Sequence, residues 1–176
     1  KVKKLCEVLS DYTYNLKLHI VPFTDIQETI YKNVDPTYMI TIMRRMMYRI
    51  GEKFMKLRKA HVLINGESIG QVASQTLTSM VAINSVTNIP VIRPVACFDK
   101  LEIIDIAKII GTYDISILPF EDCCTIFVPP HPVINPSIDK CLSEEQKIDY
   151  DKLIDECIAN IKTIEINKNK QKMDLL

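Results

Sequence analysis

The spacing of apolar residues along the chain predicts helices separated by short strands. A period close to 3.6 residues favours helices at residues 1–12, 25–33, 36–58, 71–83, 99–110 and 149–164. Alternating or continuous apolar runs favour strands at residues 16–21, 60–64 and 89–94. Because predicted helices lie between the predicted strands, right-handed crossovers are expected, and these build a parallel sheet in an α/β fold.

Residue pairs with capping-box spacing mark the starts of two of these helices. Asp25 precedes Glu28 by three positions, and Asp99 precedes Glu102 in the same way. In such a pair each side chain accepts a hydrogen bond from a free backbone N–H at the start of the helix. Gly111 is expected to end the helix that Asp99 begins, because glycine readily adopts the left-handed conformation that closes helices.

The predicted helix that Asp35 and Pro36 open carries an apolar stripe and many basic residues. Arg44 and Arg45 lie near its start with few acidic neighbours, so an arginine there can reach a phosphate or an RNA backbone with paired donors. The alternative is a solvated basic face, which is the commoner outcome for residues 53–59. The stripe expected to be buried consists of Ile40, Met43, Met47, Ile50, Phe54 and Leu57.

Residues 65–75 join a predicted strand to a predicted helix and contain Gly66 and Gly70. A glycine-bearing turn at this place allows a ligand close to the backbone, and the first helical turn presents free N–H groups to an anion. The segment is therefore a candidate nucleotide site. Two glycines four residues apart equally suit a tight turn in which Ser68 caps the helix, so the pattern alone leaves both interpretations open.

Composition places the chain among ordinary globular proteins. It has 176 residues, of which 47% are hydrophobic and 25% are charged, and its formal net charge is zero. This length suits one domain with a sizeable core. A neutral chain has no overall field that attracts nucleic acid, so any RNA contact must come from a local patch or from another domain. The sequence contains no apolar run long enough to span a bilayer, so no membrane association is expected.

The six cysteines are unevenly spaced, which favours a reducing cytoplasm over a disulfide framework or a paired zinc motif. Cys6, Cys97 and Cys157 are expected to be small buried apolar residues. Cys123 lies between acidic residues and a proline-rich segment, where a thiol is usually accessible, so we expect it to be reactive. No metal site is expected, because Cys123 and its neighbour Cys124 do not both bind one zinc ion in relaxed geometry.

Lys100 follows the capping residue Asp99 just after a predicted strand. Ligands of α/β sheets bind beyond the carboxyl ends of the strands. Lys100 is therefore a candidate phosphate contact, whereas Asp99 is expected to act only as a helix cap.

Three blocks of sequence, taken together and in order, resemble the tRNA 4-thiouridine synthetases, also called tRNA sulfurtransferases and linked to thiamine biosynthesis. The blocks are residues 66–75, residues 93–94 with 99–104, and residues 111–116 leading to 121–124. The likeness extends from the first predicted helix to about residue 164.

The resemblance implies an ATP pyrophosphatase domain of the adenine nucleotide α-hydrolase type (a PP-loop fold), in which a parallel sheet has helices on both faces. The domain is expected at residues 1–166, with a polar tail at residues 167–176. The family's first strand and its phosphate loop are expected upstream of Lys1, together with an RNA-binding region, because the chain begins inside a predicted helix without a methionine. The chain alone is therefore expected to be inactive.

The resemblance also implies a reaction, in which ATP adenylates a carbonyl oxygen of a tRNA uridine and sulfur then replaces that oxygen. Arg44, Gly66 and Gln75 occupy the positions that contact the nucleotide. Lys100 occupies a position important for activity. Cys123 occupies the position that handles sulfur, either as a persulfide or by resolving one through a disulfide. Lys100, Arg44 and Mg²⁺ are expected to stabilise the charge of the departing pyrophosphate.

The resemblance further implies the partners. The substrate is tRNA, and a separate donor such as a cysteine desulfurase is expected to supply sulfur, because only a short tail follows the last predicted helix. A thiamine sulfur-carrier protein is another candidate partner, and a cytoplasmic homodimer is expected. Two alternatives remain open: another ATP pyrophosphatase acting on a different carbonyl, which would not need Cys123, and a non-catalytic nucleotide-binding or dimerisation module.

Overall fold

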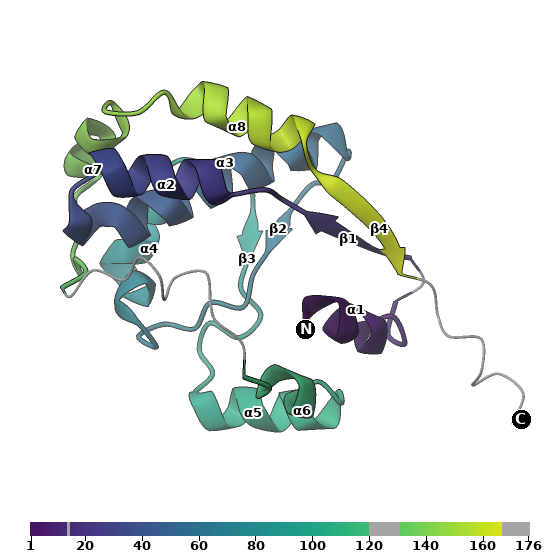
Figure 1. Ribbon diagram of the computed structural model, residues 1–176. Helices are drawn as coiled ribbons and strands as arrows, with labels where there is room; N and C mark the ends of the chain where they lie inside the picture. The colour runs from purple at the N-terminus through teal and green to yellow at the C-terminus, as the bar shows by residue number, and fades with distance from the viewer. Residues whose placement is uncertain (14, 120–130, 167–176) are drawn as a thin grey trace, which may run out of the picture. The chain divides into compact units, whose positions relative to one another are not determined.

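The computed structural model describes residues 1–13, 15–119 and 131–166, which fold into two compact units (Figure 1). The first unit contains the described residues 1–13, 15–21, 99–119 and 161–166, and the second unit contains residues 22–98 and 131–160. Both units are therefore built from segments far apart in the sequence. No helix in the described ranges is both long enough and apolar enough to cross a membrane.

The described part of the first unit combines helices with an antiparallel strand pair. Its strands β1 and β4 pair with Leu16 opposite Ile166, and an ion pair of 3.1 Å joins Lys17 Nζ to Glu165 Oε1. The elements are α1 (Val2–Leu9), β1 (Leu16–Ile20), α5 (Lys100–Ile109), α6 (Tyr113–Ser116) and β4 (Lys162–Ile166).

The prediction of a helix that continues to residue 164 is wrong, because the helix ends at Ala159 and β4 begins at Lys162. Residues 163–166 alternate polar and apolar side chains, which is the period of a strand. Threonine and isoleucine are β-branched and also favour strands. The strand predicted at residues 16–21 is confirmed as β1, which supplies the partner for this segment.

Helix α3 is the central element of the second unit and contacts α2, α4, α7 and α8 (Figure 1). It follows a single 3₁₀ turn that Asp35 caps, as predicted, by accepting a hydrogen bond from the N–H of Thr37 at 2.9 Å. The elements are α2 (Thr24–Asn33), η1 (Pro36–Tyr38), α3 (Met39–Leu57), β2 (Leu63–Ile64), η2 (Ala73–Gln75), α4 (Leu77–Asn84), β3 (Val91–Ile92), α7 (Ile138–Glu145) and α8 (Tyr150–Ala159).

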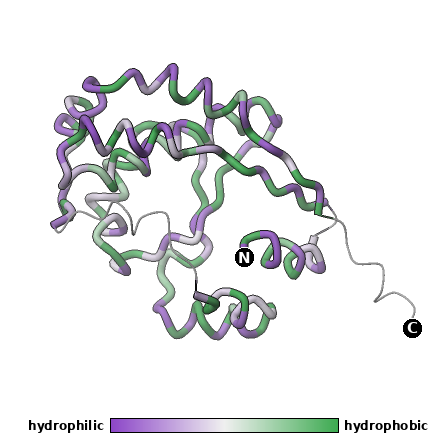
Figure 2. The backbone as a smooth tube through the Cα atoms, viewed as in Figure 1, coloured by the Kyte–Doolittle hydropathy of each residue, from purple (hydrophilic) through white to green (hydrophobic). Residues whose placement is uncertain are grey.

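The apolar stripe predicted for α3 is only partly correct. Met43 and Ile50 are buried, but Met47 is 40% exposed and Leu57 is 64% exposed. The fully buried side chains include Ile42 and Met46 instead. Helices pack around several sides of α3, so the buried surface is wider than one stripe. Figure 2 shows the resulting alternation of hydrophobic and hydrophilic residues along the helices.

Strands β2 and β3 pair in parallel, with Leu63 opposite Val91 and Ile64 opposite Ile92. The predicted parallel pairing is confirmed for these two strands, and the fold class is α/β. In the described ranges the only other strand pair is the antiparallel β1–β4 pair. The prediction of a buried strand at residues 60–64 is wrong in extent, because only Leu63 and Ile64 pair and Ile64 is 65% exposed.

The helix predicted at residues 71–83 is interrupted. Residues 73–75 form a 3₁₀ turn, Thr76 is extended with φ −67° and ψ 152°, and α4 begins at Leu77. The Thr76 hydroxyl accepts a hydrogen bond from the N–H of Ser79 at 3.1 Å and so caps α4. Threonine competes with helical backbone bonding in this way, which explains why the apolar period alone misplaced the helix start.

The capping predictions have mixed outcomes. The Asp99 and Glu102 capping box is present at the start of α5, and Gly111 follows the helix with φ +73°, as predicted. The capping box predicted at Asp25 is wrong, because α2 begins one residue earlier and Asp25 lies inside its first turn. Cys157 is buried as predicted, but Cys97 is exposed.

Candidate functional site

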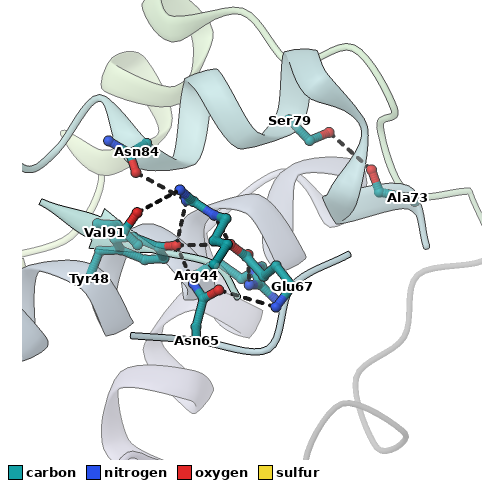
Figure 3. A network of polar contacts seen from close by, with 9 residues as sticks. Arg44, Tyr48, Asn65, Glu67, Ala73, Ser79, Asn84 and Val91 are labelled. Carbon is teal, nitrogen blue, oxygen red and sulfur yellow. Dashed lines mark hydrogen bonds and ion pairs between the residues drawn. The ribbon is translucent and has the colours of Figure 1, made fainter. Parts of the chain in front are cut away.

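A buried carboxylate, that of Glu67, lies just beyond the carboxyl end of β2 and accepts hydrogen bonds from four side chains (Figure 3). Glu67 is 3% exposed. The donors are Arg44 Nη2, the Tyr48 hydroxyl at 3.0 Å, Asn65 Nδ2 at 2.9 Å and Arg93 Nε at 2.7 Å. These five residues are called the Glu67 cluster below.

Three elements bring the Glu67 cluster together. Asn65 and Arg93 are the first residues after β2 and β3, and parallel neighbouring strands end at the same edge of a sheet. Arg44 and Tyr48 are four residues apart on α3 and therefore share one face of the helix. Because α3 contacts β2, this face meets the strand ends.

Further hydrogen bonds hold the cluster in place. Arg93 Nη2 donates to the Tyr48 hydroxyl at 2.9 Å and to Asn84 Oδ1 at 3.0 Å. Asn65 Nδ2 also donates to the Tyr48 hydroxyl at 2.7 Å, and Asn65 Oδ1 accepts from the N–H of Glu67 at 3.1 Å. Side chains with this many partners have little rotational freedom, so the cluster is a rigid base for the loop that follows.

That loop contains both glycines of the candidate nucleotide segment. Gly70 has φ +80°, a conformation that residues with a Cβ rarely adopt, and its N–H donates to the carbonyl of Gln75 at 2.8 Å. A Cβ at Gly66 would meet no atom within 4 Å, so Gly66 borders open space. The Ser68 hydroxyl donates to the carbonyl of Phe98 at 2.7 Å, so the alternative in which Ser68 caps a helix is wrong.

Burial and hydrogen bonding set the ionisation of the cluster. Burial alone would raise the pKa of Glu67, but the hydrogen bond from Arg93, the charge of Arg44 and the hydrogen bond from Tyr48 lower it below its ordinary value. Burial and the charge of Glu67 raise the pKa of Tyr48. At neutral pH the cluster therefore contains one carboxylate, two guanidinium groups and a neutral phenol.

The Glu67 cluster carries more positive than negative charge. Arg44 and Arg93 both form ion pairs with Glu67, and neither forms an ion pair with a second carboxylate in the described ranges. Charges that are partly shielded from water interact more strongly than charges at the surface. The surplus positive charge therefore favours binding of an anion beside the cluster.

Two of the predicted nucleotide contacts keep a buried polar atom without a hydrogen-bond partner among the described residues. They are Nε of Arg44 and Oε1 of Gln75. A buried polar atom left unpaired costs about 1–3 kcal/mol, which a ligand with the complementary groups would recover. A nucleotide has both kinds of group, because its phosphate oxygens accept hydrogen bonds and an adenine amino group donates them. The residues present therefore fit ATP.

Arg45, the other arginine considered as a phosphate contact, has a structural role. It is 1% exposed, and its Nε and Nη2 donate to the two carboxylate oxygens of Glu145 at 2.7 and 2.9 Å. Arg49 Nη2 donates to the same carboxylate at 3.0 Å. The hypothesis that Arg45 reaches a phosphate is wrong, because α7 encloses its guanidinium, and the apolar pattern had not predicted α7.

The other predicted site residues lie in different parts of the chain. Arg44, Gly66 and Gln75 all belong to the Glu67 cluster or its loop in the second unit. Lys100 is exposed and is the first residue of α5, in the first unit. Cys123 and the cysteine after it lie outside the described residues. Within the described ranges, no group of three His, Cys, Asp or Glu residues could hold a metal ion.

Four residues of this site had no role predicted from the sequence: Glu67, Tyr48, Asn84 and Arg93. A usable signal existed for two of them. Glu67 follows the strand predicted at residues 60–64, and Arg93 lies near the end of the strand predicted at residues 89–94. Polar residues at the ends of adjacent parallel strands meet at one edge. Tyr48 and Asn84 gave no such signal, because their places depend on how α3 and α4 pack.

Comparison with known proteins gives one consistent result. Residues 1–150 match the family described as "Thiamine biosynthesis protein (ThiI)". A probable tRNA sulfurtransferase of Macrococcus caseolyticus is 52% identical, covering 96% of this chain and 42% of the relative. One of Halothermothrix orenii is 54% identical, covering 94% of this chain and 42% of the relative.

A solved structure is also similar. The crystal structure of a 4-thiouridine synthetase–RNA complex with bound ATP has a TM-score of 0.90 and 40% sequence identity. The similarity covers 94% of this chain and 44% of that chain. The chain therefore spans less than half the length of these relatives.

Proposed function

This chain belongs to the ThiI family of thiamine biosynthesis proteins, and we therefore propose that it is part of an ATP-dependent tRNA sulfurtransferase that forms 4-thiouridine. The observation that carries the proposal is the pair of buried unpaired atoms, Arg44 Nε and Gln75 Oε1, in a site with surplus positive charge. Its support is that the curated relatives are described as probable tRNA sulfurtransferases. The similar 4-thiouridine synthetase structure holds both RNA and ATP.

In the proposed reaction, Arg44, Gly66 and Gln75 hold the nucleotide. Arg44 donates to a phosphate oxygen, Gln75 accepts from a donor of the nucleotide, and the open space at Gly66 allows close approach to the backbone. ATP supplies the adenylyl group that turns the uridine carbonyl oxygen into a good leaving group. Arg44 stabilises the negative charge that builds on the phosphates during this transfer. Lys100 is a catalytic candidate beside Cys123, and its support is the family resemblance.

We assign the sulfur step to Cys123, which lies outside the described residues. The thiolate is the reactive form of cysteine in sulfur exchange, and exchange requires access for a second sulfur. Cys123 either carries sulfur as a persulfide or resolves a persulfide by forming a disulfide with its donor. Both possibilities make Cys123 necessary for thiolation but not for nucleotide binding.

The proposed enzyme includes segments and partners beyond this chain. We assign residues 1–166 to the ATP pyrophosphatase domain and place its first strand, its phosphate loop and an RNA-binding region before Lys1. The proposed partners are tRNA, a cysteine desulfurase and a thiamine sulfur-carrier protein, and the proposed assembly is a cytoplasmic homodimer. Mg²⁺ is expected to accompany ATP, but the described residues do not form a group of three metal ligands, so we assign the ion no ligand among them.

The proposal is tested with Cys123→Ala in the complete protein. We expect 4-thiouridine to disappear from tRNA while the affinity for ATP stays unchanged, because the two steps use different residues. Mass spectrometry of tRNA nucleosides measures the first quantity and titration calorimetry the second. Cys97→Ala, which removes an exposed thiol from the described part of the chain, is the control and should retain full thiolation.

Three results would count against the proposal. Full thiolation by Cys123→Ala would contradict the role of Cys123. Normal 4-thiouridine in cells that lack the gene would favour an ATP pyrophosphatase that acts on a different carbonyl. Failure of the complete protein to hydrolyse ATP in the presence of tRNA would favour a non-catalytic module.

A further inference from the structure

We propose that Glu67 is a positioning residue that fixes the direction of the Arg44 guanidinium toward the nucleotide. The proposal rests on the proposed function, since it takes Arg44 to be a nucleotide contact. It assigns a new role, because Glu67 itself does not need to touch the ligand. Its carboxylate is buried, and both of its oxygens already accept hydrogen bonds from protein groups.

The two oxygens of Glu67 face different parts of the second unit. Oε1 accepts from Nη2 of Arg44, whereas Oε2 accepts from Tyr48, Asn65 and Arg93. One oxygen therefore holds Arg44, and the other fastens the carboxylate to the ends of β2 and β3. This arrangement ties Arg44 to the strand ends and leaves its Nε without a partner among the described residues.

A second buried carboxylate of the same unit shows what a purely structural pair looks like. Glu145 pairs with Arg45 and Arg49, both on α3, and in the Arg45 pair the Nε is satisfied and the side chain is enclosed. Arg49 is 23% exposed, and its Nε has no partner among the described residues, so only the Arg45 pair serves for comparison. Arg44 differs from Arg45, since its side chain is 26% exposed and its Nε has no partner among the described residues. The Glu67 pair thus holds one edge of a guanidinium and leaves another donor free for a ligand.

Stability alone gives little reason for an ion pair at this place. A buried ion pair is often no more stabilising than well-packed apolar residues of similar volume. An arginine that is already ordered before the ligand arrives, in contrast, assists binding directly. Ordering a long side chain costs free energy when a ligand binds, and Arg44 has already lost that freedom on folding. We therefore expect Glu67 to increase the affinity of the protein for ATP.

The test uses Glu67→Gln in the complete protein. A glutamine has one acceptor oxygen and one N–H₂ group, so it cannot accept from all four donors, and its own N–H groups would face some of them. We expect the Kd for ATP to rise about tenfold, as loss of a charge-assisted hydrogen bond predicts. Titration calorimetry with ATP and Mg²⁺ measures it.

A double-mutant comparison separates positioning from a structural effect. In an Arg44→Ala background, Glu67→Gln should cause no further loss of ATP affinity, because its effect acts through Arg44. Glu145→Gln is the matched control, since it changes a carboxylate that is also buried and also forms ion pairs with two arginines. It should lower the midpoint of urea unfolding and leave the Kd for ATP of the folded protein unchanged.

Glu67→Asp keeps the charge but shortens the side chain. If Glu67→Gln does not fold, Glu67→Asp takes its place in every comparison. A folded Glu67 variant with wild-type ATP affinity would overturn the positioning role. Equal losses of affinity with and without Arg44 would overturn it as well. Both outcomes leave the proposed function standing, whereas absence of ATP binding by the wild-type protein would overturn the function and this role together.

Discussion

Two neighbouring arginines on α3 have opposite environments. Arg44, near the end of the parallel strands, has a donor without a partner among the described residues, whereas Arg45 is enclosed by Glu145 and by the carbonyl of Ala82. Successive residues of a helix point about 100° apart, so the two guanidinium groups meet different partners. Their sequence neighbours are nearly the same, and they are distinguished by what packs against each: the end of β2 beside Arg44, and α4 and α7 beside Arg45.

Glu144 should make the protein sensitive to acid. It is fully buried, and it accepts from Lys147 at 2.6 Å and from the N–H of Asp35 at 2.8 Å, with Lys140 Nζ 2.7 Å away. Burial alone would raise its pKa, but these partners lower it from 4.5 to about 2. A carboxyl group whose pKa falls on folding stabilises the protein above its unfolded pKa and loses this effect as pH falls toward the folded value.

The stabilisation by Glu144 should therefore be complete at neutral pH and decline between about 4.5 and about 2. Glu144→Gln should flatten this part of the curve of unfolding free energy against pH, measured by urea unfolding. Glu156→Gln changes an exposed carboxylate and should leave the curve unchanged. An unaltered slope in Glu144→Gln would show that other groups govern the acid response.

Helix caps were predicted correctly at two positions and wrongly at Asp25 and Ser68, although a cap depends only on residues within three or four positions. Asp99 and Asp35 cap as predicted. Thr76 caps α4 without having been predicted, since its role appears only where the backbone becomes extended. Strand lengths were predicted poorly. The run at residues 60–64 is apolar except for His61, but β2 can be only as long as its pairing with β3.

Asp99→Ala should destabilise the protein by about 1 kcal/mol through loss of the α5 cap. The Asp99 carboxylate accepts from the N–H groups of Leu101 at 2.7 Å and Glu102 at 3.0 Å. Fraying of the first turn would also displace Lys100, so thiolation by the complete protein should fall as well. Urea unfolding and nucleoside analysis measure the two effects.

Asp105→Ala is the control for this prediction. It removes an exposed carboxylate from the same helix, 3.6 Å from Lys108 Nζ, and exposed pairs of this kind contribute little. It should leave thiolation unchanged and destabilise the protein less than Asp99→Ala. Equal effects of the two variants would mean that the cap is not what stabilises α5.

At the scale of the whole molecule, the buried residues in the described ranges are concentrated in the second unit. Helix α3 has nine buried residues, whereas α5 has none. Amide hydrogen exchange in the complete protein should therefore be slowest in α3, because its amides exchange only when a large part of the core opens. Exchange measured by mass spectrometry should be faster in α5. Slower exchange in α5 than in α3 would contradict this order.

The fold class could be predicted from the order of helices and strands, but the long-range pairings could not. Nothing near Leu16 in the sequence indicates that Ile166 lies opposite it. The same holds for Arg45, whose partner Glu145 follows 100 positions later. At the candidate site, Gly66 and Gln75 belong to one loop, and their predicted role came from the sequence block of that loop, whereas Arg93 reaches Glu67 only through the pairing of β2 with β3.

The pairing of β1 with β4 has a consequence for synthesis on the ribosome. His19 and Thr163 lie side by side in the strand pair but are 144 positions apart, so translation leaves β1 unpaired for on the order of 10 s. During that interval the backbone N–H and C=O groups of β1 are available to other nascent chains. The first unit therefore closes only when the last strand emerges, and truncation before residue 162 would leave an open strand edge prone to aggregation.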